Sequence, residues 1–446
     1  MGIRCLLVST NLAKIPYPVF PLGIAHLAGA LKSEGHLCKC FDLLSQGGNS
    51  NLSQVIKEFN PQLIAISIRN LDTVDSSDPA SFVSSTKKTV EFIRKYSKSP
   101  IVIGGPAFSI FPKEMFSYIN PDFGIIGEGE ILLPKLASLI ERKEYISERL
   151  LYGKPEIQIW KPVFYDPEIA KYYIRHGGML NIQTKRGCSF KCAYCSYPLL
   201  EGKQYRYRDP EEVGELAEII TKKLGAKYIF FTDSTFNDPH NKYLEIAEIL
   251  IKKGINTPWC AFFRPKGIGK NELKILKKAG LAAMEVGTDA STDETLEGLN
   301  KSFSMSDVFK FNDIAAELEI PCAHFIIFGG PNETQDTVKK GIKNIEKLKN
   351  SVVFAYCGIR IFPKTKIYEI ALREGVIEQK TNLLPPIFYF SPYINKEFLD
   401  KSLRNAWFGR FDRIYPCSEM LDRIKFLHQK GYIGPMWDVL VRRRKK

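Results

Sequence analysis

The stretch Thr184-Lys-Arg-Gly-Cys188-Ser-Phe-Lys-Cys192-Ala-Tyr-Cys195 contains three of the ten cysteines of the chain, at spacings of four and three residues. It directly follows an apolar segment at 179–184 that is typical of a buried strand. Thiolates at these spacings can converge on one soft metal centre only if the backbone loops around it, and Gly187 is suited to begin that loop. A closed zinc site needs a fourth Cys or His, and none lies nearby. We interpret the segment as an iron–sulfur site with one open iron, and a structural zinc site is the alternative.

Composition limits the class of protein further. The 446 residues are 44% hydrophobic, which suggests two or three domains that each bury a core. No apolar run approaches the roughly 18 residues of a membrane span, and the apolar run at the start of the chain is too short for a signal peptide. We therefore expect a cytoplasmic protein, in which cysteines are thiols or metal ligands and not a disulfide framework.

Residues 1–145 alternate short apolar runs with amphipathic stretches of helix length. This alternation predicts an α/β domain with a doubly wound parallel sheet, whose ligands bind beyond the carboxyl ends of the strands. The expected strands are 3–8, 37–41, 63–68, 101–103 and 123–126, and the expected helices are 22–33, 52–59, 82–96, 112–118 and 131–141. A proline-containing stretch follows, and we expect residues 146–175 to be a linker.

The alternation restarts after residue 175 with six further strand-then-helix units in about 200 residues. A closed eight-unit barrel needs about 250 residues, so we expect a partial barrel over 176–375. The expected strands are 179–184, 228–232, 259–263, 282–286, 323–328 and 353–361. Residues 376–446 are aromatic and basic and lose the strand pattern, which predicts a small helical C-terminal extension.

With this context, the chain resembles the radical S-adenosylmethionine (SAM) enzymes. Cys188, Cys192 and Cys195, with Tyr194 before the last cysteine, match the CxxxCxΦC signature of that family. The resemblance implies a [4Fe-4S] cluster on the three thiolates and SAM as the ligand of the open iron. It also implies an electron donor such as flavodoxin or ferredoxin.

Polar residues at the ends of predicted barrel strands fit the same resemblance. Asp233 follows the second strand, Glu285 and Thr288 end the fourth, and Glu333 lies in a GxPxET-like turn after the fifth. In similar proteins such positions, together with Tyr194, hold parts of SAM. A helix cap or turn residue is the alternative for Asp233, and stabilisation of a helix dipole is the alternative for Glu333.

The N-terminal domain narrows the resemblance to the radical SAM enzymes that bind cobalamin. Glycines at a strand's carboxyl end let the backbone approach a large flat ligand. The residues that carry the resemblance, and that it implies as cofactor-binding, are Ser67 and Arg69 after the third strand, Gly104, Gly105 and Pro106 after the fourth, and Glu128 after the fifth.

One departure from the cobalamin pattern concerns the lower face of cobalt. Relatives that supply a histidine carry an Asp-x-His-x-x-Gly segment, whereas Leu44 stands at that position here, after Asp42. We therefore expect no histidine ligand on cobalt. Arg69 is expected near that face as a non-coordinating cation, and an ion pair with Asp72 is the alternative.

The resemblance implies a reaction as well as cofactors. We expect methylation of an unactivated carbon of a small-molecule or lipid-like substrate, through a 5′-deoxyadenosyl radical and methylcobalamin. Ring formation, oxidation or lipid remodelling without methyl transfer is one alternative, and a tRNA-modifying iron–sulfur protein is another. A third is a zinc-stabilised scaffold without catalysis.

The net charge of +14 is concentrated at the C-terminus, where Arg442, Arg443, Arg444, Lys445 and Lys446 end the chain. Such a tail could contact a membrane surface or an anionic partner. Because the aromatic and basic residues after 388 form no recognisable RNA-binding module, we do not expect nucleic acid as a partner.

Overall fold

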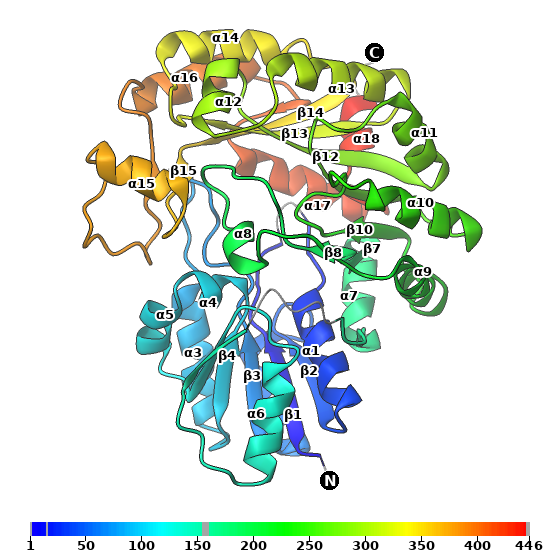
Figure 1. The fold of residues 1–446 in the computed structure, drawn as a ribbon, viewed down its shortest axis with the longest axis vertical. Coiled ribbons are helices and arrows are strands. Elements are labelled where there is room, and N and C mark those ends of the chain that lie inside the picture. Colours follow the sequence, from blue (N-terminus) through cyan, green and yellow to red (C-terminus); the bar gives the residue numbers. More distant parts are fainter. Residues whose placement is uncertain (1, 15–16, 154–159, 443–446) are drawn as a thin grey trace.

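The computed structural model describes residues 2–14, 17–153 and 160–442. Figure 1 shows two lobes, each built on a sheet with helices packed against it. The N-terminal lobe holds the first sheet, and the other lobe holds the second sheet and the C-terminal helices. Among the described residues, no helix is both long and apolar enough to cross a membrane.

The first sheet is parallel throughout, with strand order β2-β1-β3-β4-β5-β6. Its strands are β1 (Arg4–Ser9), β2 (Leu37–Asp42), β3 (Leu63–Ser67), β4 (Ile101–Gly104), β5 (Phe123–Ile126) and β6 (Leu150–Tyr152). Its helices are α1 (Leu22–Ser33), α2 (Gly48–Phe59), α3 (Val83–Arg94), α4 (Pro106–Ile110), α5 (Pro112–Ile119) and α6 (Leu132–Glu141). Burial explains the apolar strand sequences, because helices cover both faces of a doubly wound sheet.

The doubly wound fold predicted for this part is confirmed, with two additions. Strand β6 lies inside the segment expected as a linker, and it pairs with β5 through Gly124 and Leu150. A three-residue strand carries too little periodicity to be recognised in a sequence. Helix α4 begins at Pro106, directly after the glycine pair, and is not among the expected helices. The segment expected as a linker also contains most of α7 (Pro167–Gly177).

The second sheet has seven parallel strands in the order β17-β14-β13-β12-β11-β10-β7. They are β7 (Met179–Ile182), β10 (Tyr228–Phe231), β11 (Trp259–Phe263), β12 (Leu281–Asp289), β13 (Cys322–Phe328), β14 (Ser351–Cys357) and β17 (Arg413–Ile414). The α-helices that follow these strands, up to residue 373, are α8 (Tyr197–Leu200), α9 (Pro210–Glu218), α10 (Lys242–Lys252), α11 (Lys270–Lys278), α12 (Asp293–Gly298), α13 (Met305–Glu317), α14 (Gln335–Ile345) and α15 (Lys366–Arg373). Strands follow one another in chain order and the two edge strands do not pair, so the predicted partial barrel is confirmed.

The C-terminal part is more than the small helical extension that the sequence predicted. It contains α16 (Lys396–Trp407), α17 (Leu421–Gln429) and α18 (Trp437–Arg442), but it also supplies β17 to the barrel sheet. Met436, Trp437 and Leu440 are buried in one cluster with Tyr228 and Phe354 of the barrel strands. The segment therefore completes the core of the barrel. Its short strand and mixed aromatic and basic composition concealed this from sequence analysis.

Candidate functional site

A cavity of about 550 Å³ lies between the two sheets. The first domain contributes strand-end residues and the loops that follow them, including Ser67, Arg69, Gly104, Gly105, Pro106 and Glu128. The barrel contributes Asn181, Gln183, Thr232, Phe230 and Phe262. Ser196 and Tyr197, which directly follow the third cysteine, also line it. The cavity therefore brings the carboxyl ends of the first sheet into contact with the cysteine loop.

Glycines make the wall of the cavity at the end of β4. Gly105 has a φ of 98°, and a Cβ added there would lie 2.7 Å from the carbonyl oxygen of Ile68. A Cβ at Gly104 would lie 3.2 Å from the carbonyl oxygen of Ile125. A side chain at Gly105 would collide with the backbone at Ile68, and one at Gly104 would crowd the backbone at Ile125, so bare backbone lines the cavity here. Bare backbone at the carboxyl end of a strand allows a large flat ligand to approach closely.

Arg69 faces the same cavity, and its guanidinium forms no ion pair within the part of the chain that the structure describes. Burial lowers the pKa of Arg69 below its ordinary value. The alternative pairing with Asp72 is wrong, because Asp72 forms a buried ion pair with Arg360 at 2.7 Å. Leu44 packs against the hydrophobic core and does not line the cavity. Arg69 is thus a cation directed at the cavity.

The cysteine loop lies between two short strands, β8 (Lys185–Arg186) and β9 (Arg206–Tyr207), which pair antiparallel. Gly187 begins the loop with a φ of 88°, and a Cβ there would lie 2.0 Å from the carbonyl oxygen of Gln204. The Cys188 N–H donates to Gly202 O at 3.1 Å. Only glycine fits at position 187, where the backbone at Gln204 comes this close, as the sequence suggested.

The three cysteines of this loop are free thiols. Burial raises the pKa of Cys195 to about 12, and it raises the pKa of Cys188 as well. No group of three or more His, Cys, Asp or Glu residues in the described ranges is arranged to hold a single metal ion. A cluster requires a different arrangement from a zinc ion, because each thiolate binds a different iron. Three thiols on one loop suit a cluster, since a bound positive centre stabilises their thiolates.

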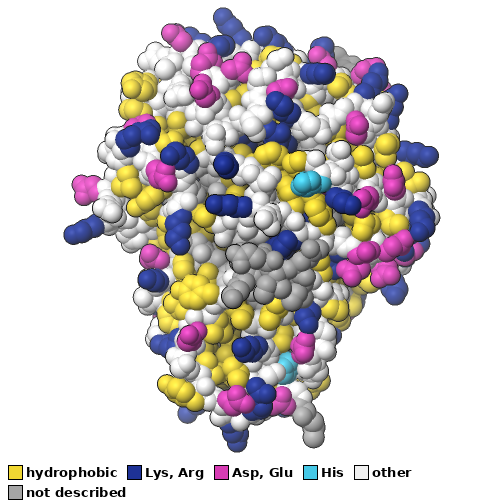
Figure 2. Space-filling model, viewed as in Figure 1, with side chains coloured by type: hydrophobic (Ala, Val, Ile, Leu, Met, Phe, Trp, Pro, Cys, Tyr) yellow, Lys and Arg dark blue, Asp and Glu magenta, His cyan; other side chains and the backbone are white. Residues whose placement is uncertain are grey.

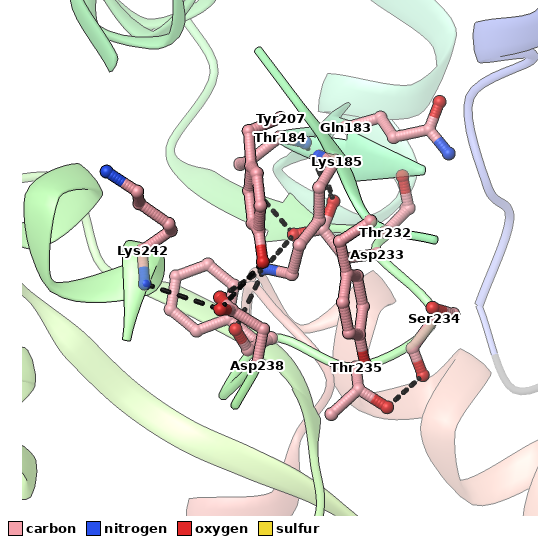
Figure 3. A network of polar contacts seen from close by, with 12 residues as sticks. Gln183, Thr184, Lys185, Tyr207, Thr232, Asp233, Ser234, Thr235, Asp238 and Lys242 are labelled. Atoms are coloured by element: carbon pink, nitrogen blue, oxygen red, sulfur yellow. Dashed lines mark hydrogen bonds and ion pairs between the residues drawn. The ribbon is translucent and has the colours of Figure 1, made fainter. Parts of the chain in front are cut away.

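Asp233 has partners other than a cofactor (Figure 3). Its carboxylate accepts hydrogen bonds from Thr184 N–H at 2.7 Å, from the Thr184 hydroxyl at 2.5 Å and from Lys185 Nζ at 3.1 Å. Asp238 lies 3.6 Å from the same lysine nitrogen, and all three charged side chains are buried. The structure therefore favours a positioning role for Asp233: it fixes the start of the cysteine loop to the end of β10.

Glu128 lines the cavity, but its carboxylate also forms ion pairs within the protein. Arg186 lies 2.9 Å from the Glu128 carboxylate and also pairs with Glu130, and Arg206 pairs with Glu128. Arg186 and Arg206 belong to the two strands that frame the cysteine loop. Burial alone would raise the pKa of Glu130, but the positive charge of Arg186 outweighs this effect and lowers the pKa to about 2. These ion pairs join the first domain to the cysteine loop.

Three further predicted residues do not line the cavity. Glu285 is 3% exposed and accepts hydrogen bonds from the Tyr17 hydroxyl at 2.7 Å and from Trp437 Nε1 at 3.2 Å. Burial raises its pKa to about 7. The Thr288 hydroxyl pairs with His324 Nδ1 at 2.8 Å, and Tyr194 contacts Lys301 Nζ at 3.4 Å.

Glu333 stabilises its own turn. It accepts hydrogen bonds from Gly329 N–H at 3.2 Å and from the Thr337 hydroxyl at 2.7 Å. The turn leads into α14, which Thr334 caps by accepting a hydrogen bond from Thr337 N–H. Glu333 therefore has a structural role in this part of the barrel.

Sequence reasoning missed several residues at the site. Lys185 and Arg186 stand beside the cysteines in sequence, and their charges were an available signal. Tyr17, Lys301 and Trp437 come from distant segments, and no motif connects them with the loop or with Glu285.

Comparison with known proteins agrees with this arrangement. Residues 182–345 match the radical SAM superfamily, and residues 8–137 match the B12 binding domain. An uncharacterized methyltransferase of Pyrococcus horikoshii is 24% identical, and the match covers 88% of each chain. An anaerobic magnesium-protoporphyrin IX monomethyl ester cyclase of Rubrivivax gelatinosus is 23% identical over 91% of this chain and 77% of that protein.

The fold is also that of a solved structure. The radical SAM methyltransferase TsrM from Kitasatospora setae, with tryptophan substrate and a SAM analogue bound, superimposes with a TM-score of 0.86. The superposition covers 100% of this chain and 98% of TsrM, at 21% identity. The likeness therefore concerns the whole architecture, including the C-terminal part.

The fold and the cysteine loop thus define a radical SAM enzyme. More narrowly, the chain combines a radical SAM domain with an N-terminal B12 binding domain. Its cofactors are a [4Fe-4S] cluster, SAM and cobalamin.

Proposed function

We propose that this enzyme methylates an unactivated carbon of a small molecule, with cobalamin as the methyl carrier. The observation that carries the proposal is the shared cavity: one wall is made by the strand ends of the B12 binding domain, and the opposite wall includes the end of the cysteine loop. When bound, the cluster and SAM supply a hydrogen-abstracting radical and cobalamin supplies the methyl group. A substrate between these walls would be within reach of both.

Residues of the chain have distinct tasks in this proposal. Cys188, Cys192 and Cys195 hold the cluster. Ser67, Gly104, Gly105 and Pro106 would form the cradle of cobalamin, and Arg69, which lines the same cavity, would lie near it as a cation. Glu128 and Asp233 act through the cysteine loop, which their partners Arg186 and Lys185 begin. Tyr194, Glu285 and Thr288 do not line the cavity, and they stay predicted SAM-binding residues.

Partners and location follow from the same chemistry. The cluster needs a one-electron donor, for which flavodoxin or ferredoxin is suitable. All ten cysteines are free, which fits the reducing cytoplasm. The face in Figure 2 carries interspersed positive and negative side chains, an arrangement that does not favour nucleic acid as a partner. Contact of the basic tail with a membrane surface is a proposal that concerns residues 443–446, outside the described ranges.

Anaerobic reconstitution with iron, sulfide and cobalamin tests the function. The enzyme is supplied with a reductant and with SAM that carries a deuterated methyl group, and it is incubated with fractionated cell extract. We expect a small-molecule product that has gained the labelled methyl group. Formation of 5′-deoxyadenosine without any labelled product would instead indicate a reaction of the kind that the cyclase relative's name describes.

Two variants provide controls for the cofactor assignment. Cys192→Ala should lose the iron of the cluster and all cleavage of SAM. Cys38→Ala removes a half-buried thiol of the first sheet and should keep both. Failure of the unmodified enzyme to retain cobalamin would overturn the proposal, even if its cluster assembled.

A further inference from the structure

Three consecutive residues, Leu299–Lys301, lie directly on the cysteine loop. Leu299 O accepts the N–H of Ala193 at 2.9 Å. Asn300 Nδ2 donates to Lys191 O at 2.7 Å, and Lys301 Nζ lies 3.4 Å from Cys192 Sγ. The segment follows α12 and is more than 100 residues from the loop in sequence. Two backbone attachments therefore fix the lysine beside one thiol.

Lys301 is a buried cation with a defined counter-charge. Its side chain is 8% exposed, and it forms an ion pair with Asp289, whose side chain is 12% exposed. Asp289 is the last residue of β12. Lys301 Nζ also lies 3.4 Å from the Tyr194 hydroxyl, one residue from the third cysteine. A lysine paired in this way keeps its charge inside the protein, and it is directed at the cysteine loop.

We propose that Lys301 and Asp289 are positioning residues that set the reduction potential of the cluster on Cys188, Cys192 and Cys195. In the step concerned, the cluster accepts one electron from an external one-electron donor, and no bond or proton changes place. A cation beside a ligand sulfur stabilises the added negative charge and makes reduction easier. The Asp289 carboxylate opposes this effect, so the two residues act with opposite signs.

Contact with a cluster cysteine distinguishes Lys301 from Lys185, Arg186 and Arg206, which are also buried beside the loop but pair with Asp233 and with Glu128 and Glu130. Lys191 and Arg264, also near the loop, are less buried than Lys301. Lys191 precedes Cys192 but is exposed, so water and salt screen its charge. Arg264 stacks on Phe190 and Phe303, and its guanidinium donates to the Ser302 hydroxyl at 2.6 Å. Lys301 combines burial with direct contact to a cluster cysteine, and Coulomb interactions are strongest where water is excluded.

The test is the midpoint potential of the cluster in the full-length reconstituted enzyme, measured by redox titration followed by electron paramagnetic resonance. Lys301→Met should shift the potential to a more negative value, and Asp289→Asn should shift it to a more positive value. Lys301→Arg should stay near the unmodified enzyme. Lys191→Met is the matched control, and its shift should be much smaller than that of Lys301→Met. Iron content is measured for each variant.

Opposite shifts in variants with full iron content would support the inference. Unchanged potentials, or shifts of the same sign in Lys301→Met and Asp289→Asn, would overturn it. If Lys301→Met assembles no cluster, Asp289→Asn decides alone: a more positive potential supports the inference, and an unchanged potential or loss of the cluster overturns it.

The inference rests on the cluster assignment within the proposed function, but it can fail separately. The titration needs neither cobalamin nor substrate. An unmodified enzyme that assembles no cluster would overturn the cysteine assignment itself. A normal cluster whose midpoint potential is unchanged by both substitutions would overturn only the role of Lys301 and Asp289.

Discussion

Asp233 and Lys185 form a buried ion pair, and we expect its loss to destabilise the protein. Asp233→Asn leaves the Lys185 ammonium with only Asp238, 3.6 Å away, as a charged partner. Breaking a buried pair costs about 3 kcal/mol or more, because one charge remains in a medium that solvates it poorly. Urea unfolding measures the difference in the free energy of unfolding.

The control for this prediction is a pair on the surface. Asp313→Asn removes the partner of Lys349, and both side chains are more than half exposed. Exposed pairs contribute about 0–1 kcal/mol. Equal losses in Asp233→Asn and Asp313→Asn would show that burial of the pair has no energetic consequence.

Glu285 makes the stability of the protein depend on pH in an unusual direction. Burial raises its pKa to about 7, against 4.5 ordinarily, so the folded state holds this proton more tightly than the unfolded state. The stability that this proton contributes is complete below pH 4.5 and is lost as the pH rises through 7. Glu285→Gln has no such proton, so it should equal the unmodified protein near pH 4.5 and exceed it by up to about 3 kcal/mol at about pH 8.

Unfolding of both proteins at a series of pH values measures this difference. The amide that Glu285→Gln introduces can still accept hydrogen bonds from Tyr17 and Trp437, so the substitution changes the charge with little change of shape. A difference that is constant with pH would contradict the raised pKa of Glu285.

At the scale of elements, α18 is a core element of the barrel. Trp437 is fully buried, packs against Phe354 with ring centroids 5.1 Å apart, and donates its N–H to Glu285. Trp437→Ala should lower the free energy of unfolding by about 3–5 kcal/mol, because it removes a large buried ring and leaves a cavity. Thermal unfolding measures the effect.

Phe408 offers a matched control in the same part of the chain. Its side chain is 92% exposed, so Phe408→Ala should change stability by less than about 0.5 kcal/mol. If both substitutions have equally small effects, α18 does not complete the barrel core, and the C-terminal part is only the small helical extension that its sequence predicted.

At the scale of the whole molecule, buried ion pairs connect the two domains. Asp72 lies in the loop after β3, and Arg360 lies in β15 (Ile359–Arg360), which pairs with β16 (Phe388–Tyr389). Their side chains are 0% and 1% exposed. Arg360→Met should destabilise the protein by about 3–5 kcal/mol, since Asp72 then remains buried without its partner.

The decisive measurement is hydrogen exchange, because the pair joins two domains. We expect faster exchange in the loop around Asp72 and in β15 in Arg360→Met than in the unmodified enzyme. Lys366→Met, which removes an exposed partner of Glu369, should leave exchange in both segments unchanged. Unchanged exchange in Arg360→Met would mean that other contacts hold the domains together.

Most of the fold was predictable from local patterns. The strands of both sheets are short runs of apolar residues that alternate with amphipathic helices. The barrel strands follow one another in chain order, whereas in the first sheet β1 lies between β2 and β3. The cysteine spacing and the strand-end glycines were likewise local signals. Strands β6 and β17 were missed because two or three residues carry no periodicity.

The sequence by itself determined the two α/β domains, the cysteine loop, the glycine-lined strand ends and hence the three cofactors. Only the tertiary structure decided which charged residues face the cavity and which bind each other. In the folded protein, Arg69 lines the cavity, Asp72 pairs with Arg360, and Asp233 pairs with Lys185. Folding also brings Lys301 beside Cys192 and buries Trp437 in the core of the barrel. The physical reason is that backbone conformation follows local sequence, whereas the partner of a buried charge is set by segments that meet only after folding.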